Sequence, residues 1–304
     1  MRRCDTAGVL RPSAGPQVSE VPEVPEVPAV PTRSAGAAPA SLVARLVAAG
    51  CVAAEEEAAE LVAAAEGRAA AAGAGAGVDQ GVLEGLVARR VAGEPLAWVT
   101  GSVWFLGHRV RVDPGVYVPR WQSEALARRA VELLPDGGLA ADLCTGAGAI
   151  AVALARARPT ARVVATDADP AACRCAAANG AGDRVEVLCG DLAAPVPAAL
   201  HGRVDVVVAV APYVPSDEIG LLPREARDHE PLVALDGGPD GLQVLRRLVR
   251  AAARLLRPGG SLLAELGGEQ DRALAPALHA AGFDAVTSHH DGDGDLRGVE
   301  ARRR

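Results

Sequence analysis

The sequence is poor in several residue types, and these shortages limit what the chain can be. Its 304 residues contain no Lys, so all 31 basic residues are Arg, and they contain a single Asn, Asn179. Aromatic residues make up 2% of the chain whereas half of it is apolar, so the core must be built from Ala, Val and Leu. The 34 Gly and 22 Pro follow no Gly-X-Y period, which excludes a collagen-like chain.

Long apolar runs and a basic excess are also missing. No uncharged apolar stretch of about 18 residues or more occurs, so we expect no membrane span. The N-terminal residues lack the apolar core of a secretory signal, and we expect a cytoplasmic protein. With a net charge of −7, a broad nucleic-acid-binding face is not indicated, so no direct nucleic-acid partner is expected. The sequence leaves the oligomeric state open.

Metal and hydrolase signatures are scarce as well. The six Cys show no C-x2-C pair and no framework spacing, so reduced thiols are expected. His289 and His290 precede alternating Asp and Gly residues that are typical of a solvated hairpin loop, and we predict no metal site. Neither a G-x-S-x-G elbow nor an H-E-x-x-H helix is present, so the sequence gives no support for a hydrolase.

The hydrophobic pattern divides the chain into a tail, a helical domain, a linker and an α/β domain. Pro recurs at every third position of a Val-Pro-Glu repeat in the tail, which favours extended geometry without a core, so we predict a disordered tail. The helical domain has three helical stretches, the first capped by Ser41. The linker alternates with a period of two, which predicts short strands or a hairpin. The predicted boundaries are 1–40, 41–94, 95–120 and 121–304.

The α/β domain alternates apolar strands with helices. Nearly continuous apolar strands predict a mostly parallel sheet that helices cover on both faces. The strands are predicted at 139–145, 161–167, 184–190, 203–210 and 261–266, with a final pair at 284–290 and 298–303. The helices are predicted at 147–157, 169–180, 242–256 and 271–282.

The turn after the first of these strands has the residues of a nucleotide-binding loop. Gly146 and Gly148 allow a tight turn and a close approach of the backbone to a ligand at the helix N-terminus. Asp167 follows about twenty residues later at the end of the next strand, where a carboxylate can bind ribose hydroxyls. Together they predict a ligand that contains adenosine.

The turn also fits the dinucleotide fingerprint, but three features favour S-adenosylmethionine (SAM) over a nicotinamide cofactor. Asp142 lies inside the preceding strand, where SAM enzymes place an acidic residue. The third strand ends before Asp191, which offers an acceptor for an adenine amino group. The fourth strand runs into Ala211, Pro212 and Tyr213, at the carboxyl edge where a substrate should lie. A nicotinamide dehydrogenase remains a distant alternative.

From about residue 41 to residue 304 the sequence resembles the HemK/PrmC-type protein-(glutamine-N5) methyltransferases. The resemblance depends on RRVAGEPLAWVTG (89–101), VDPGVYVPR (112–120), DLCTGAGAIAVALA (142–155) and, most specifically, the segment 211–242. It implies a class I SAM-dependent methyltransferase with a Rossmann-like, seven-stranded, mostly parallel sheet. A small helical domain would precede the sheet and help to dock a protein substrate, and a β-hairpin would connect the two.

The resemblance also implies roles for particular residues. Asp167 would bind the ribose of SAM, and Asp191 with Leu192 would bind the adenine. The turn around SAM would consist of Asp142, Cys144, Thr145, Gly146, Ala147 and Gly148. A loop of Val210, Ala211, Pro212 and Tyr213 would hold the substrate, with Val210 also beside SAM. The implied substrate is a glutamine side chain of a peptide chain release factor.

The substrate loop departs from the family's pattern, which reads Asn-Pro-Pro-Tyr. There the Asn side chain and the following Pro carbonyl accept hydrogen bonds from the amide NH2, and the Tyr packs on the planar amide. Val210 has no acceptor, and Asn179 belongs to a helix elsewhere. One lost hydrogen bond costs about 1–3 kcal/mol. Two alternatives therefore stay open: methyl transfer to a small-molecule or other non-amide acceptor, and a non-catalytic relative that binds SAM or a partner protein.

Smaller departures occur in the cofactor turn and ahead of the first predicted strand. Cys144 stands where the family has a Gly of the SAM turn. Residues 121–124 read Trp-Gln-Ser-Glu where the family usually has Pro-Glu-Thr-Glu. Leu192 removes an aromatic stack on adenine. We expect these changes to matter less than the loss of the Asn.

Overall fold

The computed structural model of the protein describes residues 38–71, 73 and 77–304. The tail predicted for residues 1–40 lies outside the described residues, apart from its last three. Among the described residues, no helix is both long enough and apolar enough to cross a bilayer.

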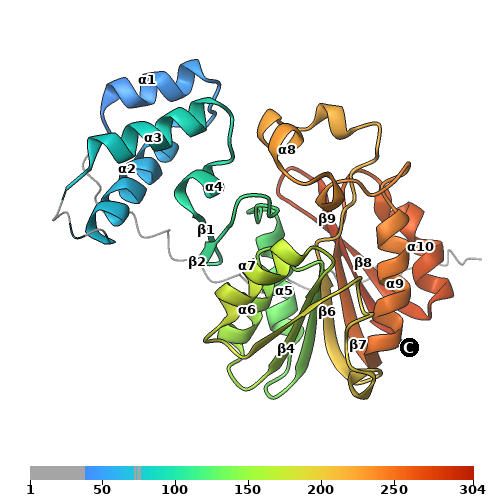
Figure 1. Ribbon diagram of the computed structural model, residues 1–304. Coiled ribbons are helices and arrows are strands. Elements are labelled where there is room, and N and C mark those ends of the chain that lie inside the picture. The colour runs from blue at the N-terminus through green and yellow to red at the C-terminus, as the bar shows by residue number, and fades with distance from the viewer. Residues whose placement is uncertain (1–37, 72, 74–76) are drawn as a thin grey trace, which may run out of the picture. The chain divides into compact units, whose positions relative to one another are not determined.

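Three helices form the first part of the described chain, as predicted (Figure 1). Leu46, Leu61 and Leu86 each come from a different one of these helices and share one buried core. The expected cap was wrong, because the residue before the first helix is Pro39 and no side chain caps this end. The helices are α1 (Ala40–Ala48), α2 (Ala54–Ala71) and α3 (Gln80–Val91).

The linker contains the predicted hairpin and, before it, a helical turn that was not predicted. The hairpin pairs β1 (Ser102–Phe105) with β2 (His108–Arg111). The helical turn is α4 (Leu96–Thr100), whose Trp, Val and Thr favour strands when taken alone. Pro95 precedes α4 and accepts two of its amide hydrogen bonds, and Gly101 ends it at a φ of 88°. These end signals outweigh the strand propensity between them.

Seven strands form one mixed sheet in the order β5-β4-β3-β6-β7-β9-β8. The pairs from β5 to β7 are parallel, and β9 runs antiparallel to both β7 and β8. This confirms the predicted fold class. The strands are β3 (Leu139–Leu143), β4 (Arg162–Asp167), β5 (Val185–Cys189), β6 (Val204–Ala209), β7 (Leu256–Glu265), β8 (Phe283–His290) and β9 (Leu296–Arg303).

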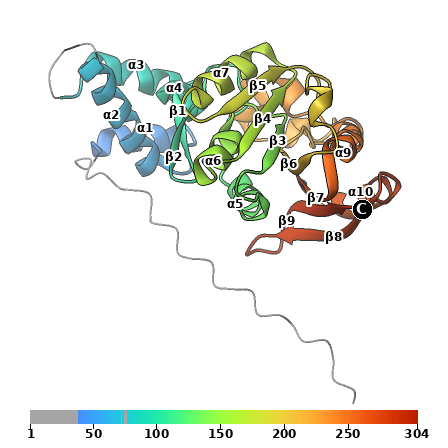
Figure 2. The ribbon, with the colours of Figure 1, turned by 90° about the horizontal axis from the view of Figure 1, so that it is seen from below.

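Helices cover both faces of the sheet, as the apolar strands predict. One core lies under α5, α6 and α7, and the other lies under α9 and α10. Figure 2 shows α5 and α6 on the opposite side of the strands from α9. Two helices, α5 and the short α8, were not predicted. The bounds are α5 (Ser123–Leu133), α6 (Ala149–Ala157), α7 (Pro170–Gly180), α8 (Arg224–His229), α9 (Gln243–Leu255) and α10 (Gln270–Ala280).

The strand order reverses at β3, which pairs with β4 on one side and with β6 on the other. In open α/β sheets a crevice forms outside the carboxyl ends of the strands at such a point, and ligands bind there. The turns that follow β3, β4, β5 and β6 therefore converge on one region.

Candidate active site

A cavity of about 420 Å³ lies at this edge of the sheet. Its volume is in the range of small-ligand pockets. We call the part lined by the turns after β3, β4 and β5, with α7 and α9, the turn half. The rest, the loop half, is lined by Tyr117, Val210, Pro212, Pro231, Val233 and Ala234.

Some residues of the predicted turn line the cavity, and others are buried and stabilise the turn. Asp142 is buried, and its Oδ2 accepts hydrogen bonds from Thr145 Oγ1 at 2.6 Å and from the Ala151 amide at 3.1 Å. Burial raises the pKa of Asp142 to about 7. Neither Asp142 nor Thr145 lines the cavity, and Ala147 is also buried outside the lining. Asp142 therefore fastens the turn to the start of α6.

Backbone conformation accounts for the glycines of the turn. Gly148 has a φ of 82°, and a Cβ there would lie 3.0 Å from the Ala176 Cα. Gly146 has a φ of 55°, but a Cβ there would meet no atom within 4 Å. Gly148 is thus required for packing on α7, whereas Gly146 leaves room for a ligand.

Cys144 occupies a backbone conformation that suits the family's Gly. Its φ is 60°, in the left-handed region that residues with a Cβ rarely adopt. The side chain lines the cavity, and burial raises the pKa of its thiol. The departure from the family therefore places a neutral thiol on the cavity wall at the cost of some backbone strain.

Asp167 presents a carboxylate to the cavity from the end of β4. Its Oδ2 accepts a hydrogen bond from the Gly146 amide and its Oδ1 accepts one from the Asp169 amide, both at 2.9 Å. Burial raises the pKa of Asp167. Each oxygen keeps a further lone pair, so the carboxylate can still accept hydrogen bonds from ligand hydroxyls.

Asp191 and Leu192 line the same half from the segment after β5. Asp191 forms an ion pair with Arg247 of α9, which also lines the cavity. Arg247 was not predicted as a site residue, because nothing in its local sequence connects it to Asp191. The carboxylates of Asp167, Asp169 and Asp191 outnumber this one guanidinium, so the turn half suits a positively charged ligand.

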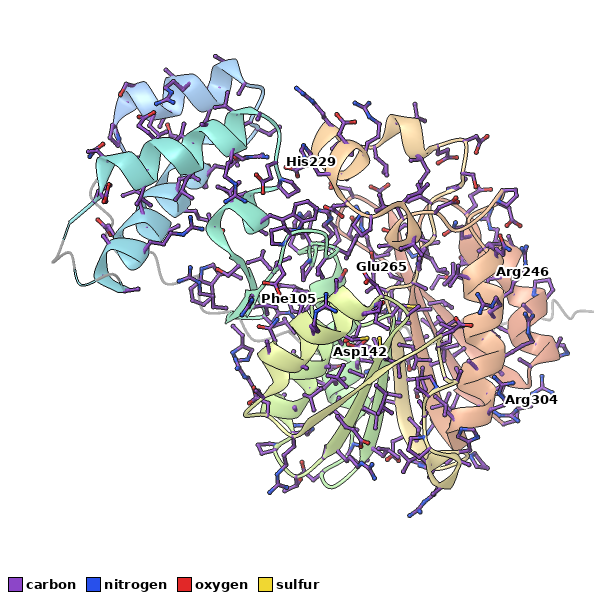
Figure 3. The ribbon with its side chains drawn as sticks, in the orientation of Figure 1. Phe105, Asp142, His229, Arg246, Glu265 and Arg304 are labelled. Atoms are coloured by element: carbon purple, nitrogen blue, oxygen red, sulfur yellow. The ribbon has the colours of Figure 1, made fainter. Side chains whose placement is uncertain are left out.

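The predicted substrate loop is split between the cavity and the protein interior. Val210 and Pro212 line the cavity, whereas Ala211 is buried and does not. Tyr213 also lies outside the lining, and its hydroxyl donates to Glu265 Oε1 at 3.0 Å. Figure 3 labels Glu265, which ends β7 near the same edge of the sheet as Asp142.

Three further residues form a group beside the loop half that sequence reasoning missed. Tyr117 lines the cavity, and the Arg120 guanidinium lies 5.1 Å from the centre of its ring. Arg120 forms an ion pair of 2.5 Å with Glu230, whose side chain is 0% exposed. The two segments are far apart in sequence, so no local motif indicates this contact.

Asn179 does not contribute to the cavity. Its Oδ1 accepts a hydrogen bond from the Arg111 amide at 2.9 Å. Its Nδ2 donates to the carbonyls of Arg111 and Ala147, both at 2.8 Å. The single Asn of the chain therefore ties the hairpin to the turn.

The sheet order, the glycine turn at the switch point and the carboxylate at the end of β4 define a class I SAM-dependent methyltransferase. The turn half fits SAM because it combines open space over the Gly146 backbone, acceptors for hydroxyls and an excess of negative charge. A family model described as "Methyltransferase domain" matches residues 140–229. SAM is therefore the cofactor, and the nicotinamide alternative finds no support.

The chain is similar to curated methyltransferases over most of its length. It is 44% identical to the release factor glutamine methyltransferase of Mycolicibacterium smegmatis, covering 72% of this chain and 79% of the relative. It is 40% identical to that of Cereibacter sphaeroides, covering 72% and 78%. It belongs to the release factor glutamine methyltransferase family.

Another relative bears on the alternative acceptors. The chain is 42% identical to the 4-amino-L-phenylalanine/4-methylamino-L-phenylalanine methyltransferase of Streptomyces pristinaespiralis, covering 64% of this chain and 70% of the relative. The match to the Mycolicibacterium smegmatis enzyme is higher in identity and covers more of the chain. A small-molecule acceptor and a non-catalytic role are therefore not favoured.

Proposed function

We propose that the protein transfers the methyl group of SAM to the side-chain amide nitrogen of a glutamine in a peptide chain release factor. Membership of the family supports the reaction. The observation that carries it for this chain is that one cavity contains both the turn half and the loop half. Bound SAM supplies a methyl group on a positively charged sulfur. Such a substrate implies a cytoplasmic enzyme.

For the turn half, we assign direct contacts and support to different residues. Asp167 would bind the ribose hydroxyls, and Asp191 with Leu192 would bind the adenine. The backbone at Cys144 and Gly146 would contact the cofactor, with Val210 at the border of the two halves. Support of the turn is assigned to Asp142, Thr145, Ala147 and Gly148.

For the loop half, orientation of the amide is the main requirement. An amide nitrogen is a poor nucleophile, so holding it in line with the methyl group supplies much of the rate. We assign this wall to Val210 and Pro212. Ala211 and Tyr213 would fix the loop from behind, since the Tyr213 carbonyl also accepts a hydrogen bond from Gln270 Nε2 at 2.8 Å.

The helical domain (41–94) would dock the release factor, with 95–120 as the hairpin linker and 121–304 as the catalytic domain. One buried contact joins the helical domain to the proposed catalytic domain. The Arg90 side chain is 10% exposed and pairs with Glu57 of α2 at 2.6 Å and with Glu225 of α8 at 2.8 Å. It connects the helical domain to the segment that leads into the loop half.

The proposal is tested by incubating the purified protein and a release factor with SAM that carries a labelled methyl group. We expect label on the release factor, and none when its glutamine at the modification site is replaced by Ala. Calorimetry should show binding of SAM and not of NAD. Binding of SAM without transfer of label to the release factor would refute the proposed substrate.

A further inference from the structure

The loop half offers few polar groups to a substrate. Five of the six residues that line it are Val, Pro or Ala, and Tyr117 carries the one polar side-chain atom among these described residues. Tyr213 does not replace it, because its hydroxyl is bonded to Glu265. The other Glu265 oxygen accepts a hydrogen bond from Ser123 Oγ at 2.5 Å. Among the described residues that line this wall, Tyr117 therefore carries the one side-chain hydroxyl, and no carboxylate holds it; it interacts with the Arg120 guanidinium, which leaves the oxygen a further lone pair for a ligand.

The Tyr117 ring is held in place by charged groups behind it. A guanidinium near an aromatic face is attracted by the negative potential of the ring. Arg120 occupies this position and is itself fixed by the fully buried Glu230. The ring is thus oriented before a substrate arrives, which lowers the entropy lost on binding.

The Tyr117 phenol is neutral at physiological pH. Burial and the nearby Glu265 charge raise its pKa. A neutral phenol can both donate and accept a hydrogen bond. This group can therefore face an amide NH2, which needs an acceptor.

We propose that the Tyr117 hydroxyl oxygen accepts a hydrogen bond from the N–H of the substrate amide, and so supplies the orienting contact that Val210 lacks. This inference rests on the proposed function. The family has an acceptor at the position of Val210. In this chain the acceptor is instead Tyr117, which lies in the segment before α5 and lines the same cavity. Tyr117 is then a catalytic residue, because it touches the reacting amide.

Tyr117→Phe tests the inference, because it keeps the ring over which Arg120 lies and removes only the hydroxyl. We expect kcat with the release factor to fall about 10-fold. The dissociation constant for SAM and the melting temperature should not change. Trp104→Phe, which alters an exposed aromatic residue of β1 outside the cavity, is the matched control and should leave kcat unchanged.

A binding measurement and a rescue separate this role from a structural one. With S-adenosylhomocysteine bound, a glutamine peptide should bind Tyr117→Phe more weakly than wild type, whereas the same peptide with norleucine for glutamine should bind both equally. Adding Val210→Asn to Tyr117→Phe should restore most of the lost kcat.

The outcomes distinguish the inference from the proposed function. An active wild type with an equally active Tyr117→Phe variant would overturn the inference alone. A wild type that methylates no glutamine would overturn the proposed function and this inference with it.

Discussion

The two halves of the cavity differ in how their residues are brought together. The turn half is built from successive strand-to-helix turns, with residues such as Gly146 and Asp167 bonded to each other. The loop half joins Tyr117, Val210 and Pro231 from distant parts of the chain, and its wall is almost wholly apolar. The difference teaches that the fold dictates the proposed cofactor site, whereas long-range packing sets the proposed acceptor site.

The largest expected effect concerns the backbone of the turn half. Gly148→Ala combines a left-handed φ with a Cβ 3.0 Å from the Ala176 backbone, so it should lower the free energy of unfolding by about 2–5 kcal/mol. Gly146→Ala meets no atom and should cost about 1 kcal/mol, but should still weaken SAM binding. Urea unfolding measures the loss of stability in both variants, and calorimetry measures their affinity for SAM. Equal destabilisation by the two variants would contradict the assignment of Gly148 to packing and of Gly146 to ligand space.

The next effect concerns the carboxylate at the end of β4. Asp167→Asn removes the charge that would bind the ribose hydroxyls, and SAM should bind about 100-fold more weakly. Asp136→Asn is the control, because it makes the same change at an exposed carboxylate that does not line the cavity. Its SAM affinity should change by about threefold or less. Calorimetry would refute the assignment if the two variants bound SAM equally.

Asp142 should make the stability of the turn half depend on pH. Its pKa is about 7 in the folded protein against 3.8 for the ordinary carboxyl, so the folded state binds more protons between these values. Stability should therefore fall as pH rises, by about 2 kcal/mol from about pH 5 to about pH 7.

Asp142→Asn can keep both hydrogen bonds through its carbonyl oxygen, because Asp142 accepts them on one atom. The free energy of unfolding of this variant should no longer fall between about pH 5 and about pH 7, as measured by urea unfolding. Asp136→Asn, which changes an exposed carboxylate, should keep the pH dependence of the wild type. An unchanged slope in Asp142→Asn would show that Asp142 is not the titrating group.

The smallest expected effect lies in the loop half. Val210→Asn adds an acceptor beside one that Tyr117 already supplies, so kcat for glutamine methylation should rise only about two- to fivefold. Val210→Leu, which adds no acceptor, should give no gain. A rise of about 100-fold or more would mean that the wild-type wall provides no orienting contact.

The sequence predicted the strands and most of the sheet's helices because their apolar periods are local. The helix α5 was not predicted, although Leu126 and Ala130 stand at helical spacing in its sequence. The missed α4 depends on its flanking Pro95 and Gly101 rather than on propensity. These errors leave the fold class unaffected.

The site was predictable to different extents in its two halves. Asp167 and Gly146 could be found because Asp167 ends β4 and Gly146 lies in the short turn between β3 and α6. The Arg247 pair with Asp191, and the Tyr117, Arg120 and Glu230 group, bring together distant segments that no motif connects. Tyr213 shows the same limit, because its hydroxyl bonds to the distant Glu265 and the residue does not line the cavity as expected.

The central claim is that the turn half binds SAM while the loop half orients the amide. Its most direct test is to measure the dissociation constant for SAM and kcat with a release factor side by side in Asp167→Asn and Tyr117→Phe. The account predicts that Asp167→Asn weakens SAM binding, and that Tyr117→Phe lowers kcat at saturating SAM with its affinity for SAM unchanged. If Tyr117→Phe weakened SAM binding as strongly as Asp167→Asn does, the two halves would not act separately and the account would be wrong.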